Sequence, residues 1–154
     1  MDKNIGVTVW PYFEELKVAK LHKDAILPKR KNATDAGFDF YAVRNTFVKS
    51  NHMAVVSTGI TMEIPPAYFG LIKPNGGSDF LIGAGVVDSG YQGEILIKVY
   101  NYKERNIIIR AGDSIGQLVL LPIIFPYVSE VSLDDIHVHE TDRGNSGGIN
   151  EDAE

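Results

Sequence analysis

The chain has 154 residues, 44% of them hydrophobic, which is enough for one domain with its own core. Its formal net charge of -5 offers no general positive field for nucleic acid, and the absence of cysteine excludes disulfides and a cysteine nucleophile. No secretory leader or membrane span is visible near the N-terminus. We therefore expect an intracellular, by default cytoplasmic, protein that binds neither nucleic acid nor membrane.

Short runs rich in β-branched, aliphatic and aromatic residues recur along the chain and predict β-strands. Turn residues, mostly proline, glycine and aspartate, separate these runs. Helical periodicity is weak and confined to residues 14–20, and residues 129–135 fit a loop equally well. The pattern is typical of an all-β sandwich or barrel with little helix. The predicted strands are residues 38–43, 53–63, 69–73, 95–100, 106–110 and 115–124.

The C-terminal residues 141–154 combine Gly144, Gly147 and Gly148 with polar and acidic side chains and contain almost nothing to bury. Such a segment is expected to be a flexible arm unless a ligand or a neighbouring subunit orders it. The predicted organisation is an N-terminal extension over residues 1–16, a β domain over 17–140 and the arm over 141–154.

Four segments, in this order and spacing, carry a resemblance to the trimeric dUTP diphosphatases (dUTPases). Residues 35–42 resemble the first family motif, with Phe40 in place of the usual leucine, and residues 83–94 match the third motif closely. Residues 112–119 match the fourth motif in part, and residues 143–147 resemble the start of the fifth. The resemblance implies a dUTPase-like β-barrel or jelly roll, a homotrimer with shared sites, and Mg²⁺ on the substrate phosphates.

The third motif contains the residue types that recognition of a deoxyuridine nucleotide requires. Glycines at 83 and 85 would let the backbone of a tight hairpin approach a planar base closely. The resemblance assigns uracil recognition to the hairpin, which comprises Gly83, Gly85, Val86 and Val87. It also implies that Asp88 is the general base that activates water and that Tyr91 packs on deoxyribose, where a 2′-hydroxyl would clash.

The phosphate-binding motifs depart from the family pattern. The second motif lacks its arginine, because Pro74 is followed by Asn75, two glycines and a displaced Ser78. The fourth motif has Ser114 where an arginine is usual, and the fifth lacks the phenylalanine that stacks on uracil. The residues left to meet the phosphates are Ser78, Gln117 and Arg143, the last from a neighbouring subunit, with Asp39 and Asn75 as possible supporting residues.

Three functions are compatible with these residues. The leading hypothesis is Mg²⁺-dependent hydrolysis of dUTP to dUMP and pyrophosphate. The alternative is a degenerate dUTPase-like protein that binds deoxyuridine nucleotides or a protein partner with little catalysis. The third is a dCTP deaminase-like enzyme, for which Glu94 is the nearest carboxylate able to move protons at a pyrimidine ring.

Overall fold

The computed structural model describes residues 15–141. The chain divides into two compact units, Met1–Ile124 and Phe125–Glu154, and every strand of the described residues belongs to the first. These strands are β1 Val18–Lys20, β2 Gly37–Tyr41, β3 Thr46–Val48, β4 Met53–Ser57, β5 Ile60–Met62, β6 Tyr68–Lys73, β7 Leu81–Ile82, β8 Gly85–Asp88, β9 Leu96–Tyr100, β10 Ile107–Ile109 and β11 Ser114–Pro122.

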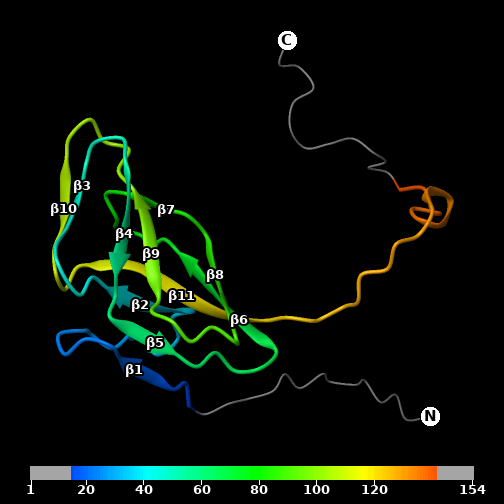
Figure 1. The fold of residues 1–154 in the computed structure, drawn as a ribbon, viewed down its shortest axis with the longest axis horizontal. Coiled ribbons are helices and arrows are strands. Elements are labelled where there is room, and N and C mark those ends of the chain that lie inside the picture. The colour runs from blue at the N-terminus through cyan, green and yellow to red at the C-terminus, as the bar shows by residue number, and fades with distance from the viewer. Residues whose placement is uncertain (1–14, 142–154) are drawn as a thin grey trace. The chain divides into compact units, whose positions relative to one another are not determined.

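Two main sheets form the first unit, and all of their strand pairs are antiparallel (Figure 1). The larger sheet has the order β2-β11-β6-β8, and the smaller has the order β4-β9-β7. Two further strand pairs, β1-β5 and β10-β3, complete the unit. Because β8 is an edge strand of the larger sheet, one of its backbone edges has no strand partner among residues 15–124.

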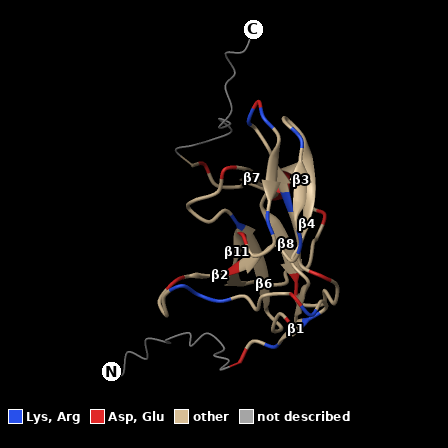
Figure 2. Ribbon diagram, turned by 90° about the vertical axis from the view of Figure 1, so that its left-hand side faces the viewer, with Lys and Arg blue, Asp and Glu red and all other residues tan. Residues whose placement is uncertain are grey.

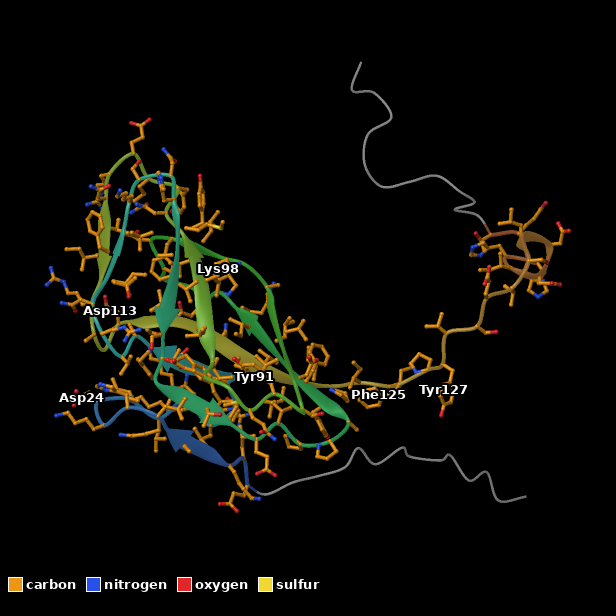
Figure 3. The ribbon with its side chains drawn as sticks, in the orientation of Figure 1. Asp24, Tyr91, Lys98, Asp113, Phe125 and Tyr127 are labelled. Atoms are coloured by element: carbon orange, nitrogen blue, oxygen red, sulfur yellow. The ribbon has the colours of Figure 1, made fainter. Side chains whose placement is uncertain are left out.

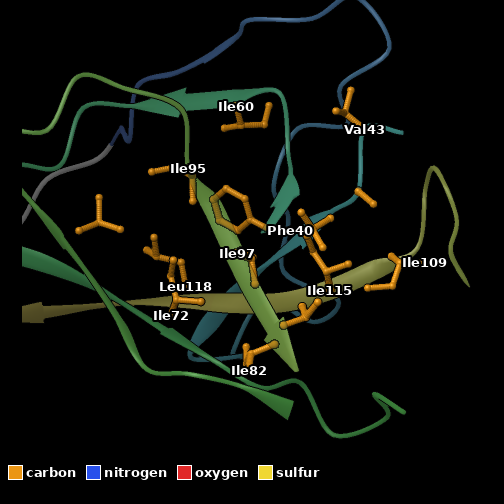
Figure 4. Packing of buried hydrophobic residues seen from close by; sticks show 14 of the residues in the cluster. Phe40, Val43, Ile60, Ile72, Ile82, Ile95, Ile97, Ile109, Ile115 and Leu118 are labelled. Carbon is orange, nitrogen blue, oxygen red and sulfur yellow. The ribbon is translucent and has the colours of Figure 1, made fainter. Parts of the chain in front are cut away.

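The hydrophobic core lies between the inner faces of the two main sheets (Figure 4). Phe40, Ile72 and Leu118 enter it from the larger sheet, and Ile82 and Ile97 enter it from the smaller sheet. The sheets approach closely at Gly116, where an added Cβ would lie 2.9 Å from Cδ1 of Ile82. This core supports the strands whose outer faces and ends carry the candidate site.

The six predicted strand regions are confirmed, and one of them is divided in two. The expected strand over residues 53–63 is two strands, because Gly59 between β4 and β5 has a φ of +66°, which only glycine adopts readily. The weak helical interpretation of residues 14–20 is wrong, since Val18–Lys20 pairs with β5 as β1. The strands β3, β7 and β8 were not predicted, because runs of two to four residues carry too little periodicity.

The second unit is described from residue 125 to residue 141. It contains a 3-10 turn, Leu133–Asp135, stabilised by a 2.7 Å hydrogen bond from the Ser132 hydroxyl to the Asp135 carboxylate. Every side chain of this range is exposed. The break between the units, after residue 124, comes earlier than the predicted start of the arm at residue 141. The predicted flexible arm, residues 141–154, lies outside the described range except for residue 141.

Charged residues of both signs are interspersed along the ribbon in the view of Figure 2. Within residues 15–141, no helix is long and apolar enough to cross a membrane.

Candidate active site

The edge strand β8 lines a groove of about 250 Å³, here called the β8 groove. Val87 points into the core, whereas Val86 and Asp88 are exposed on the outer face of the sheet. Tyr91 lines the same groove and is 43% exposed. The structure therefore brings together most residues of the third motif, and the groove is lined by Ile72, Gly85, Val86, Val87, Asp88, Tyr91, Glu94, Ile95 and Leu96.

The expected tight hairpin at Gly83 and Gly85 is wrong. Strand β7 pairs with β9 in the smaller sheet, whereas β8 pairs with β6 in the larger sheet, so Gly83 and Ala84 cross from one sheet to the other. An added Cβ at Gly85 would lie 3.3 Å from Cδ1 of Ile72, while Gly83 has no atom within 4 Å of that position. The close backbone approach at Gly85 therefore serves packing on β6.

A turn after β8 places Tyr91 beside Asp88. The Tyr91 N–H donates to the Asp88 carbonyl at 3.1 Å, which closes the turn through Ser89 and Gly90. The Tyr91 hydroxyl donates to the Glu94 carbonyl at 2.8 Å, which fixes the direction of the ring. An exposed carboxylate and an oriented aromatic ring thus share one groove. In the sequence, only the third motif indicates that the two residues lie together.

A row of polar side chains crosses the larger sheet at the other end of β6. Gln117 of β11 lies directly opposite both Asp39 of β2 and Lys73 of β6. Residues directly opposite in a sheet point to the same face, and the neighbouring Leu118 is buried, so this row faces outward. Gln117 lies over Gly37, where a Cβ would be 2.3 Å from its Oε1, and its Nε2 donates to the Pro74 carbonyl at 3.0 Å.

The loop after Pro74 is tied to β11 by the Asn75 amide. Ser78 donates its hydroxyl proton to Asn75 Oδ1 at 2.7 Å, and Asn75 Nδ2 donates to the Ser114 hydroxyl in a short hydrogen bond. This arrangement leaves the Ser114 hydroxyl proton without a partner among the described residues. The amide therefore holds the two serines together although Asn75 and Ser114 are 39 residues apart in the chain.

Ser78 and Ser114 line a second groove of about 550 Å³, here called the Ser78 groove. Arg105 and Arg110 also line it, so two arginine residues border the groove that contains the altered second motif. Arg110 is recognisable from sequence as a cation near the fourth motif. Ser114 and Arg105 are groove residues that sequence reasoning missed, because their approach to Ser78 depends on strand pairing and gives no local signal.

Asp88 of the β8 groove and the polar row occupy different places on the larger sheet. Asp88 lies opposite Phe69, four residues along β6 from Lys73, which is about 14 Å at 3.4 Å per residue. Figure 3 shows Tyr91 of the β8 groove well apart from Asp113, which lines the Ser78 groove. One chain therefore presents two separate half-sites. Arg143 lies outside the described residues.

A salt bridge positions the loop at the rim of the Ser78 groove. Lys103 Nζ lies 2.8 Å from Asp79 Oδ1. The hydrogen bond and charge of Lys103, with a smaller contribution from Arg105, lower the pKa of Asp79 below its ordinary 3.8. Because the pKa is lower in the folded protein, the pair stabilises the fold above the unfolded pKa, and this contribution is lost as the pH falls through the folded pKa.

Replacing Lys103 by methionine is expected to raise the pKa of Asp79 toward 3.8, because both leading causes of the shift disappear. Titration of the Asp79 carboxyl carbon by NMR between about pH 2 and pH 6 checks this result. Lys98→Met is the control, since Lys98 lies on β9 and has no ion pair among those found within residues 15–141. An unchanged Asp79 pKa in Lys103→Met would contradict the assignment.

No group of three or more His, Cys, Asp or Glu side chains in residues 15–141 is arranged to hold a metal ion. Asp39 is the carboxylate of the outward polar row. A single carboxylate with nucleotide phosphates is a usual environment for Mg²⁺, so the donors present fit an ion held mainly by substrate phosphates.

The fold and grooves define a β-protein that combines an edge strand, a carboxylate and an aromatic ring in a small groove, with serine and arginine donors in another. The family model for dUTPase matches residues 23–148. A deoxyuridine 5′-triphosphate nucleotidohydrolase from Paramecium bursaria Chlorella virus 1 is 38% identical over 136 residues, covering 86% of this chain and 94% of that relative. The chain therefore belongs to the dUTPase family.

Solved structures agree with this assignment. The dUTPase of Staphylococcus bacteriophage 80alpha with dUpNHpp has a TM-score of 0.79 and 27% identity, covering 88% of this chain and 97% of that chain. A mutant dUTPase from phage phi11 of S. aureus, described for its coordination of a structural Mg(II) ion, has a TM-score of 0.72 and 25% identity. That match covers 78% of this chain and 99% of the phage chain. The predicted all-β, dUTPase-like fold is thereby confirmed.

Proposed function

We propose that the protein hydrolyses dUTP to dUMP and pyrophosphate. The observation that carries the proposal is the β8 groove, where Asp88 and Tyr91 lie beside a strand edge that no other strand of residues 15–141 pairs with. The phage 80alpha relative carries a nucleotide analogue, and the Chlorella virus relative is named for hydrolysis of deoxyuridine triphosphate. Membership of the same family supports the same substrate class here.

The residues of the β8 groove divide the recognition of the nucleoside between them. The free backbone edge of β8, from Gly85 to Val87, offers N–H and C=O groups that can pair with the polar edge of uracil. Val86, which is 63% exposed, supplies apolar contact. Tyr91 lies against the sugar and leaves no room for a 2′-hydroxyl.

Asp88 acts as the general base. Its exposed carboxylate accepts a proton from water, and the resulting oxygen nucleophile attacks a phosphorus atom so that the bond between the α- and β-phosphoryl groups breaks. Pyrophosphate leaves, and dUMP stays with the base and sugar contacts until it dissociates. Asp39 would be the protein carboxylate available to a Mg²⁺ ion held mainly by the substrate phosphates, and such an ion would supply charge neutralisation there.

Donors from the second half-site bind the phosphates. Ser78 and Gln117 contribute as the motifs imply, and the free hydroxyl proton of Ser114 adds a donor in place of the usual arginine. Arg143 is proposed to arrive from a neighbouring subunit. Because Asp88 lies about 14 Å along β6 from Lys73 of the polar row, a homotrimer that combines half-sites from different subunits fits this separation.

Replacing Asn75 by alanine is expected to raise KM for dUTP about tenfold, because Ser78 and Ser114 lose the amide that holds them. Steady-state kinetics at saturating Mg²⁺ measures the change. Gly76→Ala is the matched control in the same loop, since its added Cβ has no atom within 4 Å and should leave KM unchanged. Equal KM values for Asn75→Ala and Gly76→Ala would show that the Asn75 amide has no part in phosphate binding.

The alternative, a degenerate binding protein, is favoured by the missing phosphate-binding arginines. The deaminase alternative is less suited to the geometry of Glu94, whose Oε1 already accepts hydrogen bonds from the Ser57 hydroxyl and the Gly59 N–H. A carboxylate engaged by two donors of its own fold is poorly placed to move protons at a pyrimidine ring.

Pyrophosphate release from dUTP, dCTP, dTTP and UTP with Mg²⁺ tests the proposal. Turnover of dUTP with little turnover of the other three nucleotides is the expected result. Ammonia release from dCTP would indicate the deaminase. Absence of all turnover, together with measurable dUMP binding, would overturn the proposed dUTP hydrolysis and favour the degenerate binding protein.

A further inference from the structure

The ring of Tyr91 lies directly against the backbone of Gly93. A Cβ added at position 93 would lie 2.5 Å from the Tyr91 hydroxyl oxygen, 2.7 Å from Cζ and 3.2 Å from Cε2. Real Cβ atoms essentially never approach other heavy atoms more closely than 3.0 Å. The observed position of the ring is therefore open only to a chain that has glycine at 93.

The acceptor that holds the Tyr91 hydroxyl is itself immobilised by the fold. The Glu94 carbonyl accepts the hydroxyl at 2.8 Å, and Glu94 Oε1 accepts the Gly59 N–H at 2.7 Å and the Ser57 hydroxyl. The next residue, Ile95, is 1% exposed and donates its N–H to the Ile60 carbonyl at 2.8 Å. The link between β4 and β5 thus anchors the backbone to which the ring is tied.

We infer that Gly93 determines specificity by having no side chain. The space at position 93 lets the Tyr91 ring stay where its hydroxyl donates to the Glu94 carbonyl. In that position the ring forms the side of the β8 groove that excludes ribonucleotides. The inference rests on the proposed function, since it concerns the sugar contact of the same groove. Gly93 acts through Tyr91 and does not line the groove within the described structure.

An alanine at 93 forces the Tyr91 ring to move, because the nearest ring atoms and the new Cβ cannot both keep their places. The ring then loses its hydrogen bond to Glu94 and no longer occupies a defined position beside Asp88. Contacts to deoxyribose weaken, and the 2′-hydroxyl of a ribonucleotide meets less steric opposition. The preference for the deoxynucleotide should fall by about tenfold or more, within the range that a single steric contact provides.

The experiment compares the wild-type protein with Gly93→Ala and with Gly90→Ala. Gly90 is in the same turn, has no atom within 4 Å of an added Cβ and has no positive φ, so its substitution should change nothing. Two ratios are measured: kcat/KM for dUTP against UTP, and the calorimetric affinity for dUMP against UMP. The second ratio needs no catalysis.

A fall in both ratios for Gly93→Ala, with wild-type values for Gly90→Ala, is the expected result. A folded Gly93→Ala protein whose ratios stay within about twofold of wild type overturns the inference, because a steric contact of this kind is worth more than that. If wild type hydrolyses no nucleotide, the proposed activity fails, and the dUMP-to-UMP affinity ratio alone decides the role of Gly93.

Tyr91→Phe is the second variant, in case Gly93→Ala does not fold. It keeps the ring and removes only the hydroxyl that donates to Glu94. A partial fall in the dUMP-to-UMP affinity ratio is expected, since the ring loses its anchor. An unchanged ratio would show that the anchored ring position has no part in sugar selection, and that result also overturns the inference.

Discussion

Replacing Asp88 by asparagine is expected to lower kcat for dUTP hydrolysis about a thousandfold, the middle of the range for loss of a general base. The exposed carboxylate lies in the β8 groove with Tyr91 and is the only aspartate lining that groove within the described residues. Asparagine keeps the size and most polar contacts of the side chain but cannot accept a proton from water. Stopped-assay pyrophosphate release measures kcat, and calorimetry with dUMP checks that binding is retained within a few-fold.

Asp24→Asn is the matched control for this substitution. Asp24 is exposed, lies well away from Tyr91 in Figure 3, and is 3.7 Å from a His22 nitrogen in a solvent-exposed pair. Both variants replace one exposed aspartate by asparagine and remove one negative charge, so a general effect of charge would appear in both. A loss in Asp88→Asn of less than about tenfold would assign proton transfer to another group.

Replacing Leu118 by alanine is expected to lower the free energy of unfolding by about 3 to 5 kcal/mol, as large-to-small substitutions in closed cores do. Leu118 is 0% exposed in the middle of β11, the strand that joins β2 to β6. It packs over Gly70, where an added Cβ would lie 2.8 Å from its Cδ1, so no neighbouring side chain at 70 can fill the space left. Urea unfolding measures the change.

Leu21→Ala removes the same atoms from a leucine that is 57% exposed and should lower the free energy of unfolding by less than about 1 kcal/mol. Both variants must be compared at one protein concentration, because association with other subunits would add to the stability of each. Similar losses for the two leucines would mean that the space around Leu118 closes by rearrangement, against the rigid packing inferred from Gly70.

Several features of the protein could be predicted from local sequence because they depend on neighbours in the chain. Strand β9, Leu96–Tyr100, is a run of aliphatic and aromatic residues broken only by Lys98, and such a run predicts a strand from local sequence. Asp88 and Tyr91 share a turn of the third motif, so their presence in one groove follows from a short segment. The all-β class and the family resemblance follow from such patterns.

The polar row and the Ser78 groove depend instead on which strands pair and in which register. Asp39, Lys73 and Gln117 meet only because β11 lies between β2 and β6 in one particular register. A shift of β11 by one residue would turn Gln117 to the face opposite Asp39 and Lys73, and burial of the whole sheet decides between these registers.

The sequence by itself therefore determined the strand-rich class, the main strands and the motif residues of the β8 groove, since each is encoded by adjacent residues. Only the tertiary structure decided that β8 joins β6 while β7 joins β9, which replaced the expected hairpin by a crossing between sheets. It also decided two hydrogen bonds between distant parts of the chain. Asn75 and Ser114 are separated by 39 positions, and Ser57 and Glu94 are separated by 37 positions. Such pairings result from packing the complete core, and no local pattern of side chains specifies them.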